Sequence, residues 1–162
     1  MRRLLKTAIV VLALVLTSHM PVFAGPAEDA AAAWNKQDYA TAARLYRSLA
    51  EQGNASAQHF LGKMYQNGEG VPRDTVQAAK WFRLAADQGH TGAQFYLGGM
   101  YATGEGVPRD YVQAYKWFAI CSKSAEGAFA EASRNDVAAK MTPQQIAAAQ
   151  RLASEWKPTK AN

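Results

Sequence analysis

The sequence has little of the side-chain chemistry on which most enzymes depend. Its 162 residues include one cysteine and three histidines. One cysteine cannot form an internal disulfide, and so few cysteines and histidines leave no metal-ligand spacing. We therefore predict no catalytic residue, no bound metal and no cofactor. Cys121 takes the place that Ala85 holds 36 residues earlier, so we expect a small buried side chain and not a reactive thiol.

The chain also lacks the basic surface that nucleic acids require. Its formal net charge is +5, but Arg2, Arg3 and Lys6 belong to an N-terminal segment, residues 1–24, that has no acidic residue. Without these three, 15 basic and 13 acidic residues remain, a net charge of +2. No basic run interleaved with aromatic residues follows, so we predict no nucleic acid partner.

A long hydrophobic run is missing as well. The basic start precedes nine apolar residues, 8–16, and then a polar break, whereas about 20 apolar residues are needed to span a bilayer. Together with Val22-Phe23-Ala24, this pattern predicts a signal peptide over residues 1–24 that is cleaved after Ala24. The mature protein is then expected to be periplasmic or secreted, without stable membrane insertion. An uncleaved membrane anchor is the alternative.

What the sequence does contain is an internal repeat. A shift of 36 residues places residues 53–88 on residues 89–124 without a gap. The run Gly-Glu-Gly-Val-Pro-Arg-Asp at residues 68–74 recurs unchanged at residues 104–110. A more diverged copy precedes both within residues 25–52. Self-similarity at a fixed period of this length indicates tandem supersecondary units.

Each unit is predicted to begin with a helix over residues 55–67. Gly62 in mid-helix costs about 1 kcal/mol relative to alanine, which the close approach of a neighbouring helix would offset. Gly68 and Gly70 then end the helix and turn the chain. The predicted buried face has helical spacing and consists of Ala57, Leu61, Met64 and Tyr65.

A second helix is predicted to begin after Asp74. The Asp74 carboxylate can accept hydrogen bonds from the free backbone N–H groups of the first turn, and Gln77 stands where a capping box has its second member. Gly89 lies where such a helix ends. Its buried stripe is predicted to consist of Ala78, Trp81, Phe82 and Ala85.

These shared residues resemble the Sel-one-like repeat, a relative of the tetratricopeptide repeats. The resemblance covers about residues 34–124. It is carried by Leu61-Gly62, Met64-Tyr65, residues 68–74, Lys80-Trp81-Phe82 and their copies 36 residues later. It implies an all-α, right-handed superhelical solenoid of antiparallel helix pairs, here about four pairs including terminal caps. It also implies an adaptor or assembly scaffold, not an enzyme.

The ends of the repeat domain, residues 25–157, are expected to be modified, because stacked repeats leave an open apolar face at each end. Residues 126–139 are predicted to form a helix with Phe129, Ala132 and Ala139 facing inward. A last helix is predicted to start at Thr142. We divide the domain into a diverged first pair (25–52), two repeats (53–88 and 89–124) and C-terminal capping helices (125–157), followed by a frayed tail (158–162).

The positions that differ between the two first helices predict a binding surface. They fall on the helix face opposite the buried one, and first helices line the concave groove in tetratricopeptide-like solenoids. Phe95 in particular is costly to expose without a partner. The alternative is an unconstrained solvent face. The candidate groove consists of His59, Lys63, Gln66, Asn67, Phe95, Gly99 and Thr103.

Two possible sources of chemistry are weaker. His59 is predicted to face outward and His90 to lie in a turn, and their copies are Phe95 and Asn54. A catalytic pair should not be replaced so freely. The loop glutamates, Glu69 and its copy, could pair only if the twist of the solenoid brought adjacent loops together.

The sequence therefore predicts a non-catalytic protein-binding or assembly scaffold of the cell envelope that holds a protein or peptide partner in the groove. The alternative is an envelope enzyme or small-ligand binder that acts on cell-wall-type material. A third hypothesis is a homo-oligomer assembled through the terminal helices.

Overall fold

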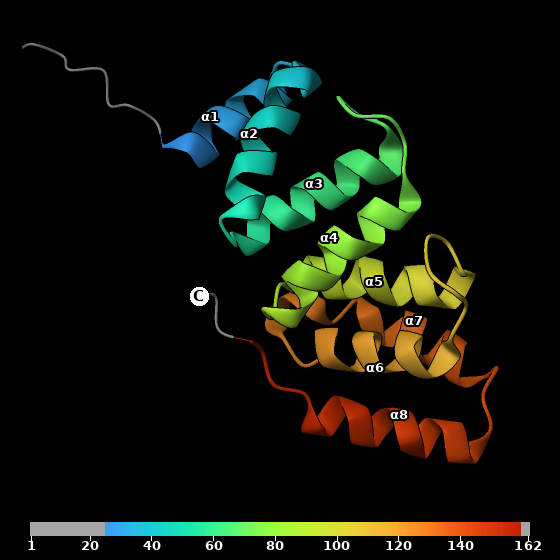
Figure 1. The fold of residues 1–162 in the computed structure, drawn as a ribbon. Coiled ribbons are helices and arrows are strands. Elements are labelled where there is room, and N and C mark those ends of the chain that lie inside the picture. Colours follow the sequence, from blue (N-terminus) through green and yellow to red (C-terminus); the bar gives the residue numbers. More distant parts are fainter. Residues whose placement is uncertain (1–24, 160–162) are drawn as a thin grey trace, which may run out of the picture.

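The computed structural model describes residues 25–159, so the predicted signal peptide lies outside the described residues. Within this range the chain is a stack of helices and has no strand (Figure 1). The helices are α1 (Pro26–Asn35), α2 (Tyr39–Glu51), α3 (Ala55–Asn67), α4 (Thr75–Asp87), α5 (Thr91–Thr103), α6 (Tyr111–Cys121), a 3-10 turn η1 (Ala125–Gly127), α7 (Ala130–Ala138) and α8 (Pro143–Glu155).

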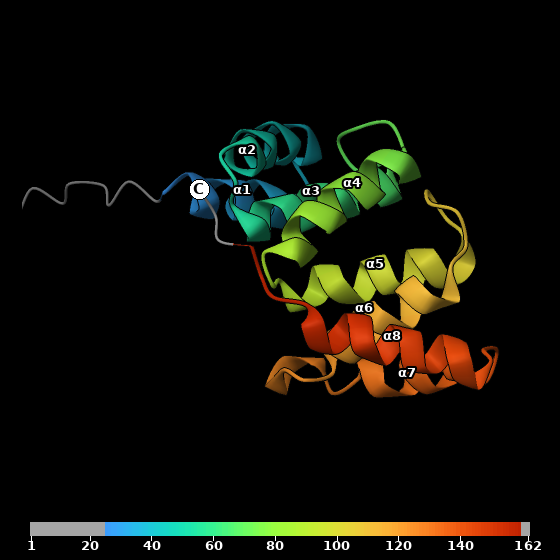
Figure 2. The same ribbon diagram turned by 60° about the horizontal axis from the view of Figure 1, so that its bottom comes forward.

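The helices form three successive pairs, α1–α2, α3–α4 and α5–α6, and each pair packs on the next. Figure 2 shows the same succession after a turn of the molecule, with α8 beside α6 at the end of the stack. The predicted all-helical repeat solenoid is therefore confirmed. The predicted first helix, residues 55–67, also has the bounds of α3.

The second helices begin as predicted, but their caps differ from the predicted capping box. The Asp74 carboxylate accepts a hydrogen bond from the Gln77 backbone N–H at 2.9 Å. The backbone N–H of Asp74 donates to the Tyr65 carbonyl at 2.9 Å, and Asp110 donates to Tyr101 in the same way. The second half of the cap thus ties each second helix to the first helix of its own pair.

Glycine sets the spacing between the elements. An added Cβ at Gly62 or Gly98 would lie 2.8 Å from the ring of Phe82 or Phe118, which confirms the predicted close helix approach. Gly106 requires a positive φ of 70°, and a Cβ there would lie 2.1 Å from the Thr75 carbonyl oxygen. Each loop therefore rests on the start of the preceding second helix.

The repeated apolar positions build the core. Leu61, Met64 and Phe82 are fully buried, as predicted, whereas Trp81 is half-buried. Cys121 is buried too, and its Sγ lies 3.5 Å from the Thr91 carbonyl oxygen. Burial raises the pKa of the Cys121 thiol to about 11, so the thiol stays protonated and unreactive at neutral pH.

The segment after α6 corrects one prediction. Residues 126–139 do not form a single helix, because the chain turns at Gly127, where an added Cβ would lie 1.7 Å from the Cys121 carbonyl oxygen. The turn changes the helical phase, so Ala130 and Val137 are buried. Phe129, predicted to face inward, is 54% exposed. The other two predicted inward residues, Ala132 and Ala139, are also exposed.

The C-terminal helices do not form a fourth helix pair. Both α7 and α8 pack on α6. Helix α8 starts with a full capping box between Thr142 and Gln145, as predicted. The tail was predicted to fray from residue 158, and residues 160–162 of it lie outside the described residues. The Thr159 N–H donates to the Asp87 carbonyl at 2.8 Å. This hydrogen bond holds Thr159 at the end of α4.

Candidate protein-binding face

Aromatic rings form a continuous row across the first helices of the three pairs. Successive ring centroids lie between 4.8 and 6.3 Å apart, which is the range of favourable aromatic contacts. The row crosses α1, α3 and α5 and ends just before α7. No ring in it is fully buried. We call it the aromatic face, and in order it consists of Trp34, Phe60, His59, Tyr96, Phe95 and Phe129.

Four of the seven predicted groove residues line a single hollow of about 220 Å³ beside this row. Tyr96, Met100 and Glu105 complete its wall. The hollow lies between the end of α3 and the length of α5, because Gln66 comes from α3. The four predicted residues that the structure brings together are Gln66, Phe95, Gly99 and Thr103.

The other predicted residues lie outside the hollow. The Lys63 ammonium sits 5.9 Å from the centre of the Trp34 ring and 5.8 Å from that of Phe60, at the other end of the aromatic face. These distances allow cation–π attraction. Asn67 is exposed at the end of α3, where its amide donates to the Glu69 carboxylate at 3.3 Å.

His59 does not face outward as predicted. It is half-buried, and its ring stacks on that of His90 with 4.5 Å between centroids. Burial first, and then the charges of His90 and Lys63, lower the pKa of His59 to about 4. The ring is therefore neutral at pH 7. Its Nε2 is buried without a hydrogen-bond partner and lies 3.2 Å from where a Cβ of Gly92 would stand.

His90 has a structural role at the start of α5. Its Nδ1 accepts a hydrogen bond from the Ala93 backbone N–H at 3.2 Å. Its repeat counterpart, Asn54, accepts from the Ala57 N–H at 2.9 Å. The two residues are therefore equivalent N-caps. The structure brings the two histidines together, but as a ring stack beside a helix cap.

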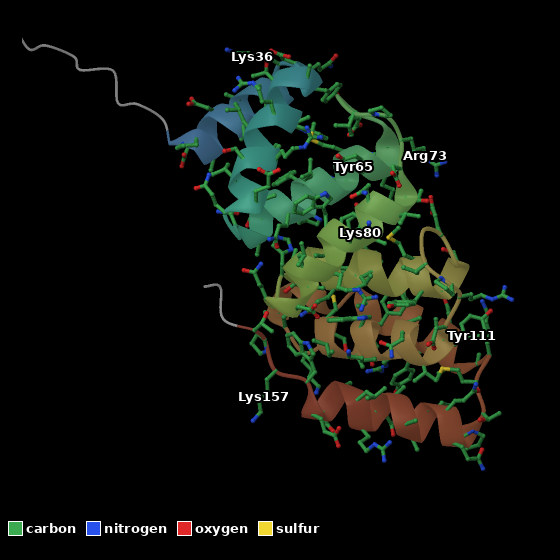
Figure 3. The ribbon with its side chains drawn as sticks, in the orientation of Figure 1. Lys36, Tyr65, Arg73, Lys80, Tyr111 and Lys157 are labelled. Carbon is green, nitrogen blue, oxygen red and sulfur yellow. The ribbon has the colours of Figure 1, made fainter. Side chains whose placement is uncertain are left out.

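The loop glutamates do not pair with each other. Glu105 forms an ion pair with Arg73 of the preceding loop at 2.6 Å, and Figure 3 shows Arg73 on that loop beside Tyr65. Because both side chains are substantially exposed, such a pair contributes at most about 1 kcal/mol. It links successive loops at the edge of the hollow.

Four residues of the aromatic face were missed in the sequence. Phe60 and Tyr96 carry a usable signal, because they occupy the same repeat position and are both aromatic. Trp34 and Phe129 lie outside the two regular repeats, so the period does not place them. Phe129 in addition depends on the turn at Gly127 that the sequence pattern concealed.

Residues 25–159 contain neither a membrane-spanning helix nor a cluster of metal-ligating side chains. No helix there is long and apolar enough to cross a membrane. Nor does any group of three or more histidine, cysteine, aspartate or glutamate side chains come close enough to hold a metal ion within that range.

The repeats match a known family model, and the fold matches solved structures. The Sel1 repeat model covers residues 36–54, 55–90 and 91–120. No curated protein matches the sequence. A protective antigen of uropathogenic Escherichia coli strains, which displays an SLR fold, is 36% identical with a TM-score of 0.77 and covers 81% of this chain. A Sel1 repeat protein from Oxalobacter formigenes is 26% identical, with a TM-score of 0.65 and the same coverage.

The chain spans 29% of the length of the first of these structures and 56% of the second. The family model accounts for more than half of this chain. The repeat positions that it recognises are those that build the solenoid described above. The chain belongs to the Sel1 repeat family, whose repeats generally bind protein partners and are generally not enzymatic.

Proposed function

We propose that this chain is a non-catalytic protein-binding scaffold of the cell envelope, and that it holds a segment of a partner protein against the aromatic face. The row of partly exposed rings carries the proposal. Contiguous aromatic surface is rare on a protein that binds nothing, and aromatic side chains dominate the affinity of protein interfaces. The hollow beside Phe95 and Tyr96 offers a pocket for one side chain of the partner.

The partner segment is expected to combine apolar and acidic residues. Lys63 lies over the rings of Trp34 and Phe60, and no described carboxylate forms an ion pair with it. An acidic side chain of the partner can therefore approach Lys63 while an apolar neighbour packs on the rings. The Glu105 carboxylate is already neutralised by Arg73.

A direct test uses the mature chain, residues 25–162, to select peptides from a displayed random library. The double variant Lys63→Ala/Phe129→Ala should lower the affinity of selected peptides at least about tenfold, in line with the loss of one interface anchor. Arg44→Ala is the control, since Arg44 is exposed on α2 and lies outside the aromatic face and the hollow. Equal affinity of all three proteins, measured by fluorescence anisotropy, would reject the aromatic face.

The envelope location rests on the signal-peptide pattern of residues 1–24. Expression of the full chain in a bacterial host, followed by cell fractionation and N-terminal sequencing, tests it separately. We expect a mature product that begins at Gly25 in the periplasm or the medium. A cytoplasmic product that retains Met1 or starts at Arg2 would refute the location and leave the aromatic face untouched.

The alternative, an envelope enzyme or small-ligand binder for cell-wall-type material, draws its support from the hollow with its two aromatic walls. Titration with soluble cell-wall fragments distinguishes it from protein binding. Saturable binding or hydrolysis that is lost in His59→Ala would favour this alternative. The cap formed by His90 favours the scaffold.

A further inference from the structure

A second apolar surface lies on α4, away from the residues of the aromatic face. Val76 is 52% and Leu84 48% exposed. With Lys80, they follow each other at four-residue spacing along one face of the helix, and Figure 3 shows Lys80 in the middle of α4. Gly106 and Val107 of the next loop form the opposite side of a groove of about 530 Å³. We call this groove the α4 face.

The same face of α6 is already covered. Ile120, the repeat counterpart of Leu84, is only 6% exposed. Helix α8 lies over it: the Gln150 amide donates to the Tyr115 hydroxyl at 3.3 Å, and the Lys123 ammonium to the Ala153 carbonyl at 3.4 Å. Tyr115 and Lys123, which hydrogen-bond to α8, are the repeat counterparts of Ala79 and Asp87 in the α4 face.

The same face of α2 needs no cover. Its counterparts of Val76, Lys80 and Leu84 are Ala40, Arg44 and Ser48, and all three are exposed. The three second helices therefore show three conditions of one surface. At the position of Leu84, α2 has an exposed serine, α6 a buried isoleucine and α4 an exposed leucine. An apolar surface that is covered in one repeat and open in the next indicates a missing partner element.

We propose that the α4 face is the docking site of an amphipathic helix from a partner protein, seated on α4 as α8 is seated on α6. The precedent defines the chemistry of that helix. Ala149 and Ala153 of α8 are buried against α6, so small residues on the partner helix allow the same close approach.

One difference between the two faces indicates where the partner helix is larger than α8. The α4 face has Ala79 where α6 has the bulky Tyr115. The space above Ala79 therefore takes a leucine-sized side chain of the partner, at the place where Gln150 of α8 meets Tyr115.

The charges of the α4 face favour acidic residues on the partner helix. Lys80 and Arg83 line the groove together with a single carboxylate, Asp87. The Arg83 guanidinium hydrogen-bonds the Tyr101 hydroxyl and is held in place. Burial raises the pKa of the Asp87 carboxyl. Acidic side chains flanking the apolar stripe of the partner would meet Lys80 and Arg83.

The test uses a fluorescent peptide with the sequence of residues 141–158, in which Gln150→Leu fills the space above Ala79 and Arg151→Glu and Lys157→Glu supply the acidic residues expected to meet Lys80 and Arg83. Added to the mature chain, it should bind saturably, and Leu84→Glu and Val76→Glu should each weaken binding at least tenfold. Phe129→Glu, equally exposed but on the aromatic face, should change binding less than twofold. This comparison also separates the α4 face from the function proposed above.

Three results would overturn the proposal. The first is no saturable binding of the probe. The second is binding that Leu84→Glu and Val76→Glu leave unchanged, which would show that the probe exchanges with α8 on α6. The third is a dimer of the mature chain in light scattering that Leu84→Glu dissolves, which would make the occupant a second copy of this chain. Because Val76 and Leu84 are half exposed, both variants should keep the wild-type circular dichroism spectrum.

Discussion

The two central repeats, α3–α4 and α5–α6, share their caps, loops and buried stripes but differ on their surfaces. Asp74 and Asp110 cap their helices alike, and Gly62 and Gly98 receive equivalent phenylalanine rings. On the aromatic face, His59 stands where the second repeat has Phe95. On the outer side, Leu84 is open where Ile120 is covered.

This contrast separates folding from binding within one period. Positions that repeat unchanged hold helices at a fixed spacing, because a solenoid is stabilised mainly by contacts between neighbouring units. Positions that differ are free to face other molecules. Four experiments test this division.

The shared loop glycines should have the largest effect. Gly106→Ala and its counterpart Gly70→Ala place a Cβ 2.1 and 2.0 Å from a backbone carbonyl oxygen, at positive φ. Each should lower the free energy of unfolding by about 3 kcal/mol or more. Gly99→Ala is the control, because a Cβ there would meet no atom within 4 Å outside the local helix backbone, and it should stabilise α5 by up to about 1 kcal/mol. Urea titration measures all three, and equal effects would contradict the shared framework.

The outer faces should respond next. Ile120→Ala removes a side chain buried under α8 and should cost about 2–4 kcal/mol. Leu84→Ala, the equivalent change on the open α4 face, should cost less than about 1 kcal/mol. Thermal or urea unfolding of the two variants gives the difference. Similar losses would mean that the α4 face is buried in solution.

On the aromatic face we expect a pH effect that comes from His59 of the first repeat. The pKa of His59 is about 4 in the folded chain, against 6.5 for the free side chain, so the unfolded chain binds the proton first. The contribution of the neutral His59 ring to the free energy of unfolding is fully present above pH 6.5 and is lost as the pH falls toward 4. The loss should be roughly 1–2 kcal/mol after allowance for the solvent contact of the ring.

The control for this effect comes from the other repeat. His59→Phe introduces the residue type of Phe95. It should remove the loss of stability between pH 6.5 and pH 4 that the wild type owes to His59. Urea titrations at pH 7 and pH 4.5 measure the difference. Parallel losses of stability in both proteins would show that His59 does not contribute.

The smallest effect is expected at the loop ion pair. Arg73→Ala removes the ion pair with Glu105. Because both side chains of the pair are substantially exposed, the variant should lower the free energy of unfolding by less than about 1 kcal/mol. The loss should shrink further at high salt. A larger, salt-independent loss would assign the rigidity of the loops to this pair and not to their glycines.

Most of the fold could be predicted because its signals are local. The bounds of α3, the Asp74 cap and the end of α4 before Gly89 follow from residues within one helical turn of each boundary. The period then transferred each prediction to the next repeat. Outside the regular repeats the sequence pattern was a poorer guide. The turn at Gly127 changed the phase of α7, and the hydrogen bond of Thr159 to Asp87 has no repeated counterpart.

The candidate site was predictable only in part, for a related reason. Helical spacing placed Phe95, Gly99 and Thr103 on one face, and the structure gathers them in one hollow. Contacts between repeats depend on the angle at which helices cross, which no local pattern specifies. The stack of His59 on His90 and the row that joins Trp34 to Phe60 arise in this way.

The most direct test of the aromatic face is photo-crosslinking in cells that express the full chain. A photoreactive phenylalanine analogue replaces Phe95 in one strain and Ser48, on the polar face of α2, in another. We expect a discrete crosslinked adduct from position 95 that Lys63→Ala/Phe129→Ala diminishes, and none from position 48. The same adduct from both positions, or no adduct from position 95, would contradict it.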